Sequence, residues 1–435
     1  MLKTLGIASV EELLKDVPAS LRVKELKLDE GLSEMELLRV LRRTGQKNAH
    51  ADRFISFLGA GNYDHYIPSI VPHLAMRGEF ITSYTPYQGE ASQGTLQFIY
   101  EFQSLMCNLT GMDVANASMY DGASAVAEAA LMALRGSEKK ELFVSETVHP
   151  ESIETLKTYL SNLDTPITIV PERNGTMDLD FLKSRVTDKV AAVIYQSPNF
   201  LGYAEDGSEI ARLSKAKGAV VIASVNPLSL SLFAPPGDTG ADIAVGEGQP
   251  LGNAVSYGGP HFGFFAAKWD FLRRMPGRIC GQTVDRDGKR AFVLTLQARE
   301  QHIRREKATS NICTNHSLCA LKATIFLAAL GEKGFRRMGE LNLERAHAAL
   351  SVLKKIPGVK SYSDAPFFNE FTVKIQRDPK RLKTSLEERH ILGPLSLARF
   401  DARRKGHYLV AVTEQRTDED ILRLADAVKG AGRQT

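Results

Sequence analysis

Six short apolar runs in the middle of the chain limit its fold more than any other feature. They cover residues 141–145, 167–170, 190–195, 219–223, 242–245 and 263–267. Largely continuous apolar runs of this length are typical of strands buried on both faces. Helical segments are predicted between several of them, near residues 152–163, 179–186 and 207–217. The alternation predicts a doubly wound α/β core with a mostly parallel sheet.

The remaining segments predict two further parts. A long helix over 320–356, with glycines at 331 and 334 as a candidate break, is followed by predicted strands at 370–375 and 408–412 and helices at 379–390 and after Thr417. This order is typical of a small α+β domain. We therefore expect a helical arm over 1–60, a large α/β domain over 61–325 and a small α+β domain over 326–435.

The predicted arm consists of short amphipathic helices. Ser9 with Glu12, and Ser33 with Glu36, have the spacing of capping boxes before leucine-rich runs. Such an arm packs either on its own domain or on a neighbouring subunit, and the pattern fits both.

Composition excludes several classes of protein. The 435 residues carry 55 Lys and Arg against 51 Asp and Glu without long blocks of one sign, which argues against a nucleic-acid platform. The four cysteines, at 107, 280, 313 and 319, fit a reducing cytoplasm better than a disulfide framework. The Cys313–Cys319 cluster lacks a second ligand pair for zinc, so no metal is expected. With no apolar run near the ~20 residues that span a bilayer, we expect a cytoplasmic protein without membrane contact.

A small-residue turn at 119–124 leads directly into an alanine-rich segment. Gly122, Ala123 and Ser124 stand where a helix would begin. The backbone N–H groups and the serine hydroxyl at such a helix start can bind a phosphate group. The alternative is an ordinary helix cap over close packing.

A segment rich in Gly, Pro, Tyr and His runs from Phe57 to Gly94. It is too aromatic to be disordered, and long irregular segments inside globular chains are often functional. We interpret it as the wall of a site, or as a tyrosine-rich subunit contact, and both can hold together. The helix predicted after it, over 95–110, has an apolar face.

Five motifs resemble one known family over almost the whole chain. They are Tyr-Thr-Pro-Tyr-Gln-Gly-Glu-Ala-Ser-Gln-Gly at 84–94, Tyr-Asp-Gly-Ala-Ser at 120–124, Gly-Glu-Gly-Gln-Pro-Leu-Gly at 246–252, Gly-Gly-Pro at 258–260 and Thr-Ser-Asn-Ile-Cys-Thr-Asn at 309–315. They resemble the first subunit of the glycine cleavage system P-protein in its two-chain form. The resemblance implies an aspartate-aminotransferase-like fold of type I, with pyridoxal 5'-phosphate (PLP) at a subunit boundary and a small C-terminal domain.

The resemblance also implies roles for individual residues. Gly122, Ala123 and Ser124 would bind the cofactor phosphate, and His149 would stack on the pyridine ring. Because His149 precedes Pro150, it can equally be an ordinary helix-start residue. The residues expected near the substrate are Tyr84, Thr85 and Gln88, and those expected near a phosphate or the interface are Ser310, Asn311, Thr314 and Asn315.

The chain departs from the family pattern at two positions. PLP enzymes hold the cofactor as a Schiff base on a lysine, yet no lysine occurs between Asp242 and Ala267. Gln249 and Pro250 stand where the catalytic chain would carry His-Lys. The acid expected to pair with the pyridine nitrogen falls near Ala223, which has no acidic neighbour.

We therefore expect the lysine, and the covalently held PLP, on a second homologous chain whose active site this chain completes. The resemblance implies that glycine loses its carboxylate as CO2 and that the aminomethyl group passes to the lipoyl group of H-protein, in a two-plus-two heterotetramer. One alternative is a non-catalytic scaffold that stabilises the partner and docks H-protein. Another is an independent PLP enzyme that uses Lys268, which follows a different strand from the expected one. A nucleotide-binding enzyme is disfavoured, because no glycine-rich fingerprint follows the first strand.

Overall fold

The computed structural model describes residues 1–23, 25–82, 84–135, 137–312 and 315–432. The chain divides into two compact units, residues 1–50 and 51–435. The first unit contains α1 (Leu2–Leu5), 3-10 turns at Val10–Leu14 and Ala19–Leu21, and α2 (Glu34–Gly45), and none of these four described elements buries a residue.

The capping prediction holds for one of the two sites in this unit. Both bonds of the capping box between Ser33 and Glu36 are present at the start of α2. Ser9 instead precedes a 3-10 turn without a side-chain cap bond, while the Glu12 carboxylate accepts the Ala8 N–H at 2.9 Å.

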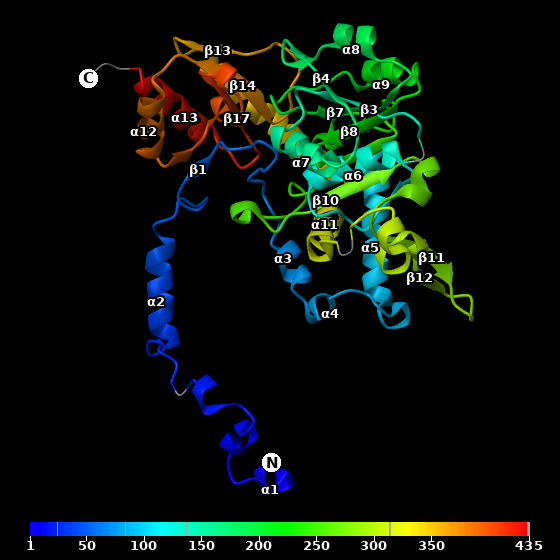
Figure 1. The fold of residues 1–435 in the computed structure, drawn as a ribbon. Helices are drawn as coiled ribbons and strands as arrows, with labels where there is room; N and C mark the ends of the chain where they lie inside the picture. The colour runs from blue at the N-terminus through cyan, green and yellow to red at the C-terminus, as the bar shows by residue number, and fades with distance from the viewer. Residues whose placement is uncertain (24, 83, 136, 313–314, 433–435) are drawn as a thin grey trace. The chain divides into compact units, whose positions relative to one another are not determined.

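The second unit is built on a seven-stranded sheet in the order β2-β10-β9-β8-β7-β3-β4 (Figure 1). Its strands are β2 (Val114–Ala115), β3 (Glu141–Ser145), β4 (Ile167–Val170), β7 (Val190–Ser197), β8 (Val220–Val225), β9 (Ile243–Glu247) and β10 (Gly263–Ala267). β10 is antiparallel to β9 and β2, and the other pairs are parallel. All six predicted strands are present, so the prediction of a mostly parallel α/β sheet is confirmed.

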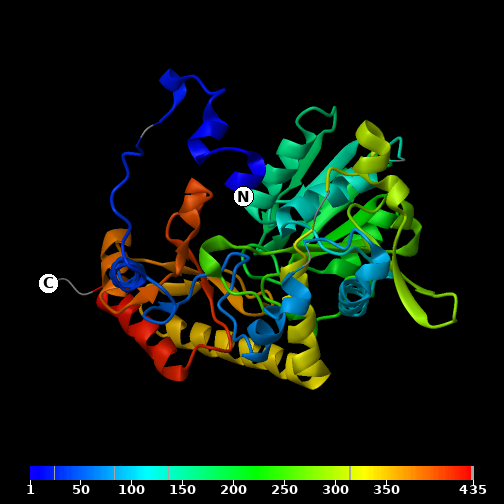
Figure 2. The same cartoon turned by 90° about the horizontal axis from the view of Figure 1, so that it is seen from below.

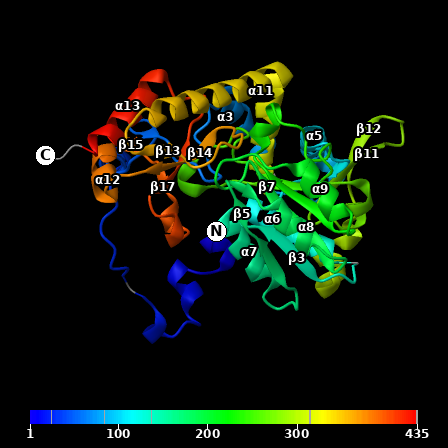
Figure 3. The same cartoon turned by 90° about the horizontal axis from the view of Figure 1, so that it is seen from above.

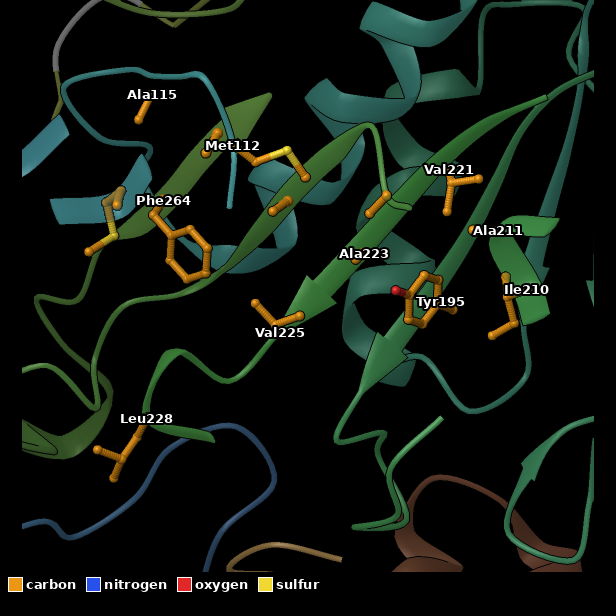
Figure 4. Packing of buried hydrophobic residues seen from close by; sticks show 14 of the residues in the cluster. Met112, Ala115, Tyr195, Ile210, Ala211, Val221, Ala223, Val225, Leu228 and Phe264 are labelled. Atoms are coloured by element: carbon orange, nitrogen blue, oxygen red, sulfur yellow. The ribbon is translucent and has the colours of Figure 1, made fainter. Parts of the chain in front are cut away.

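Helices cover both faces of this sheet. They are α5 (Gln93–Thr110), α6 (Gly122–Leu134), α7 (Pro150–Leu160), α8 (Leu179–Arg185), α9 (Gly207–Lys215) and α11 (Ser317–Lys354). Ile222 of β8 packs in the cluster that includes α6 and α7, whereas Val221 and Ala223 pack in the cluster that includes α5, α8, α9 and α11. Figure 4 shows the second cluster, with Tyr195 of β7 and Phe264 of β10 among its side chains. Successive side chains of a strand point to opposite faces, so strands buried on both faces are apolar throughout.

The last part of the chain forms a second, antiparallel sheet in the order β13-β14-β17-β16. Its strands are β13 (Val359–Ser361), β14 (Glu370–Ile375), β16 (Leu395–Ser396) and β17 (His407–Ala411), and its helices are α12 (Pro379–Glu387) and α13 (Asp418–Gly430). Thr417 and Asp420 form the capping box that starts α13. α11 bends at Gly331, where φ is 59°, and contacts both α5 and α13. Figures 2 and 3 show α11 (yellow) beside α13 (red).

Several short elements were not predicted from the sequence. They are the antiparallel pair β11 (Ile279–Val284) and β12 (Arg290–Thr295), the pair β5 (Glu172–Arg173) and β6 (Thr176–Met177), the pair β1 (Ile55–Ser56) and β15 (Ile391–Leu392), and the helices α3 (Ile70–Ala75), α4 (Gly78–Ile81) and α10 (Gln301–Arg304). Among the described residues, no helix is both long and apolar enough to cross a bilayer.

Phe264 tests the core beneath the central sheet. Its side chain is 0 % exposed in the cluster between β8, β10 and the helices. Replacing Phe264 with Ala should lower the free energy of unfolding by about 3–5 kcal/mol, because the removed ring leaves a cavity. Urea denaturation followed by circular dichroism measures this change.

The control is Leu422→Ala on α13, since Leu422 is 56 % exposed. This change should stay within about 0.5 kcal/mol of the parent chain. Equal losses for the two variants would contradict the packing described here.

Candidate functional site

A cavity of about 380 Å³ lies at the carboxyl ends of the central strands. Gln196 and Pro198 contribute from the end of β7, Ser224 to Asn226 from β8, and Glu247 and Pro250 from β9. Ligands of doubly wound sheets bind at this edge. The cavity is therefore where the topology predicts a site.

Three other segments complete its wall. Residues 60–63 cross it from the loop after β1, residues 121–123 contribute the start of α6, and His149 with Glu151 contributes the start of α7. Among the described residues that line the cavity, none is Lys or Arg, whereas Asp121, Glu151 and Glu247 carry carboxyl groups. The lining does not supply a positive side chain to an anionic ligand.

The start of α6 forms bonds within the chain. The Asp121 side chain accepts the Ser124 N–H at 2.7 Å, and the Ser124 hydroxyl donates to the Asp121 carbonyl at 3.1 Å. The Gly122 N–H donates to Glu247 Oε2 at 3.0 Å. The N–H groups of Gly122 and Ser124 are thus bonded to the chain's own carboxyl groups, and the Ser124 hydroxyl to a backbone carbonyl.

Glu247 comes from the end of β9 and faces this helix start. Its Oε1 also accepts the Gln249 N–H, at 3.2 Å. Burial raises the pKa of Glu247 to about 8, although the N–H groups of Gly122 and Gln249 act in the opposite direction. Both carboxyl oxygens therefore have backbone partners.

Gln249 holds the loop that crosses the cavity. Its Oε1 accepts the Tyr63 N–H at 2.9 Å, and its Nε2 donates to the Tyr63 carbonyl at 2.9 Å and the Asn253 carbonyl at 2.7 Å. The side chain is only 1 % exposed. Since buried amides need partners, Gln249 acts here as a structural clamp on residue 63.

A buried carboxyl group fixes the same loop from the other side. Glu370 of β14 is 4 % exposed, its Oε1 accepts the Ala60 N–H at 2.7 Å, and its Oε2 accepts the Tyr63 hydroxyl at 2.9 Å. Burial raises the pKa of Glu370 to about 7. The loop at 60–63 is therefore bonded both to Gln249, which follows β9 of the central sheet, and to Glu370 in β14 of the small sheet.

Both ring nitrogens of His149 form hydrogen bonds within the chain. Nδ1 accepts the Glu151 N–H at 3.1 Å, so Nε2 carries the proton and donates to the Ala60 carbonyl at 3.1 Å. Burial lowers the pKa of His149, and the ring meets Phe200 edge-on at 4.8 Å between centroids. The ring is held as a neutral imidazole at the cavity wall.

The structure separates the predicted substrate residues from this cavity. Tyr84 is 78 % exposed and Gln88 is exposed, while Thr85 is buried and accepts a hydrogen bond from the Arg278 guanidinium. None of the three lines the cavity. Their predicted role remains a prediction about a site outside this pocket.

Of the predicted residues near 310, the described Ser310, Asn311 and Asn315 do not line the cavity. Ser310 is buried and bonded to Glu128, and its hydroxyl accepts the Ile312 N–H at 3.0 Å. Asn315 donates to Ser118 Oγ at 3.1 Å, and Asn311 is exposed. Thr314 lies outside the described residues.

Comparison with known proteins identifies the family. The sequence model described as "Glycine cleavage system P-protein" matches residues 1–428. The chain belongs to the glycine cleavage system P-protein family. A Desulfitobacterium hafniense protein named "probable glycine dehydrogenase (decarboxylating) subunit 1" is 50 % identical over 98 % of this chain and 95 % of its own length. A Bacillus cereus protein of the same name is 49 % identical over 97 % of this chain and 94 % of its own length.

Solved structures agree with this assignment. A crystal structure of glycine decarboxylase (P-protein) of the glycine cleavage system, in inhibitor-bound form, has a TM-score of 0.91 and 43 % identity over 99 % of this chain and 97 % of that chain. A Lactobacillus brevis glutamate decarboxylase has a TM-score of 0.70 at 12 % identity over 94 % of this chain and 95 % of that chain, and shows the fold alone. The P-protein chain thus has the type I fold of PLP-dependent enzymes, as predicted.

The cavity does not fit PLP in this P-protein chain. A PLP site needs a lysine for the aldehyde and an acid for the pyridine nitrogen. No described lining residue is a lysine, and β8 ends at the cavity with Ser224, Val225 and Asn226. Glu247 occupies the Gly122 N–H, which a phosphate at this helix start would use.

Sequence reasoning missed the roles of Glu247 and of the short loop at 60–63. Glu247 bonds to a residue 125 positions away, and Tyr63 bonds to one 186 positions away. The available signal was a carboxyl residue at the end of a predicted strand, where a doubly wound sheet places its site.

Glu370 yields a test of the buried network by pH. Its raised pKa means that, between about pH 4.5 and 7, the folded chain keeps a proton that the unfolded chain loses. Its contribution to stability therefore falls as pH rises through this window. Glu370→Gln cannot lose that proton, so from pH 4.5 to 8 the parent chain should lose up to about 3 kcal/mol relative to the variant.

Urea denaturation of the parent chain and Glu370→Gln at several pH values measures the difference between their free energies of unfolding. The contributions of all other titratable groups cancel in this difference. Glu419→Gln, at an exposed position at the start of α13, is the matched control. A difference between Glu370→Gln and the parent that stays constant with pH would contradict the burial of an ionisable group here.

Proposed function

We propose that this chain is the first subunit of a two-chain glycine dehydrogenase (decarboxylating), and that it completes the active site of a second subunit that holds PLP. The proposal rests on the chemical groups that the cavity of this chain lacks. There is no lysine between Asp242 and Ala267, and the described lining offers no cation. A P-protein chain of this kind needs the lysine from elsewhere.

The loop at 84–92 is suited to reach a neighbouring site. Thr85 is bonded to Arg278, and Gln93 bonds both backbone groups of Phe292, at 2.9 and 2.8 Å. Tyr84, directly before the first anchor, is 78 % exposed, and Tyr87, between the two anchors, is 81 % exposed. Rigid aromatic side chains on a fixed loop are typical of subunit contacts.

In the proposed complex, PLP on the second subunit supplies the electron sink for decarboxylation of glycine. Tyr84, Thr85 and Gln88 of this chain would orient the substrate and exclude water, and Ser310, Asn311, Thr314 and Asn315 would support a phosphate or the interface. Lipoylated H-protein would receive the aminomethyl group, in a two-plus-two heterotetramer located in the cytoplasm. We also propose that the chain consists of a helical arm over 1–60, a large α/β domain over 61–325 and a small α+β domain over 326–435.

Borohydride trapping tests which chain holds the cofactor. This chain and the second subunit are treated with PLP, reduced and digested, first separately and then mixed. Mass spectrometry should find a reduced cofactor at one specific lysine of the second subunit only, and release of CO2 from glycine should need both chains. Specific labelling of this chain at Lys268, with CO2 released by this chain alone, would overturn the proposal.

Variants of the exposed loop separate a shared site from a scaffold. Tyr84→Phe and Gln88→Ala should each lower glycine decarboxylation by about tenfold or more while the complex stays assembled, because lost positioning raises the barrier by at least about 1.4 kcal/mol. The readout is CO2 release alongside size-exclusion chromatography.

Tyr159→Phe, on α7 and outside the described cavity lining, is the control. Unchanged turnover in both loop variants would favour a scaffold subunit that only stabilises its partner and docks H-protein.

A further inference from the structure

Two N–H groups in the first turn of α6 donate to carboxyl groups of the chain, and a third makes an ordinary backbone helix bond. Glu247 Oε2 takes the Gly122 N–H at 3.0 Å, the Asp121 side chain takes the Ser124 N–H at 2.7 Å, and the Asp121 carbonyl takes the Ala125 N–H at 3.1 Å. Asp121 is a normal cap, local in sequence. Glu247 is not local, since it comes from the end of β9.

The backbone is arranged to bring Glu247 to this position. A Cβ atom on Gly122 would lie 2.7 Å from the Glu247 backbone nitrogen and 3.0 Å from the Gly246 carbonyl carbon. Glycine therefore allows the start of α6 to touch the end of β9. The Glu247 side chain turns back across this contact, and its second oxygen is fixed by the Gln249 N–H.

A phosphate bound at a helix start uses the same N–H groups and the same space. In this chain that space also faces the carboxyl groups of Asp121 and Glu151 at the cavity wall. At the helix start the Gly122 N–H is thus satisfied by the Glu247 side chain without any ligand.

We infer that the Glu247 carboxyl group takes the place of a phosphate in this chain's own pocket and excludes phosphate esters from it. The inference deepens the proposed function, on which it rests for its meaning: the chain would lack PLP because a lysine is missing and because the phosphate position is filled. The assembled enzyme then holds one PLP for each pair of unlike chains. Replacing Glu247 with a smaller residue should allow a phosphate ester to bind at the start of α6.

The test uses the full-length chain and pyridoxamine 5'-phosphate, which has no aldehyde and does not condense with surface lysines. Binding is followed by isothermal titration calorimetry, with pyridoxamine as the probe that lacks the phosphate. The parent chain should show no saturable binding. Glu247→Ser and Glu247→Ala should each bind the phosphate ester at least about tenfold more tightly than pyridoxamine, a difference of about 1.4 kcal/mol.

Two matched variants distinguish whether phosphate is excluded by the Glu247 side chain that fills its position or by the negative charge of the cavity. Glu247→Gln keeps a side chain of the same shape with one accepting oxygen, so it should bind the phosphate ester more weakly than Glu247→Ser. Glu151→Gln removes a negative charge from the same cavity but leaves the helix start filled, so it should still not bind the phosphate ester. Circular dichroism confirms that each variant is folded.

Three results would overturn the inference. They are saturable one-to-one binding of pyridoxamine 5'-phosphate by the parent chain, absence of such binding in both folded variants that lack the carboxyl group, and equal binding by Glu247→Gln and Glu247→Ser. Each concerns this chain alone. Failure of the proposed function would instead appear in the trapping experiment, as label on this chain, so the two failures are distinguishable.

Discussion

The site depends on the direct contact between the end of β9 and the start of α6. Because Gly122 has no side chain, the two backbones meet, and the Glu247 carboxyl group can bond to the Gly122 N–H. A larger residue at 122 would separate strand and helix. The contact sets the depth of the cavity and determines which donors remain for a ligand, so the chemistry of the pocket follows from packing.

A buried polar network then fixes the opposite wall. Gln249 bonds both backbone groups of Tyr63, and Glu370 bonds the Tyr63 hydroxyl and the Ala60 N–H. Buried groups of this kind must be satisfied, and a network in which each oxygen has a partner specifies one arrangement. The loop over the cavity is thereby bonded both to the segment after β9 and to β14.

The sequence predicted the elements that depend on local patterns. Continuous apolar runs located the central strands, and glycines near 331 located the bend in α11. The pair β11 and β12 was missed, because its exposure alternates weakly and its partner strands belong to no larger sheet. The small-residue helix start was predicted, whereas the Glu247 side chain that bonds to it was not, since long-range pairing leaves no periodic signal. The absence of a lysine between Asp242 and Ala267 could be read directly from the sequence.

The Gln249 clamp has an evolutionary consequence. A lysine introduced at position 249 would remove an amide that holds Tyr63, and a lysine at 250 would still face the filled helix start beside Glu247. A single lysine substitution at 249 or 250 therefore leaves the Gly122 N–H bonded to Glu247. In the proposed two-chain enzyme, this chain and the lysine-bearing chain must therefore be inherited and expressed together.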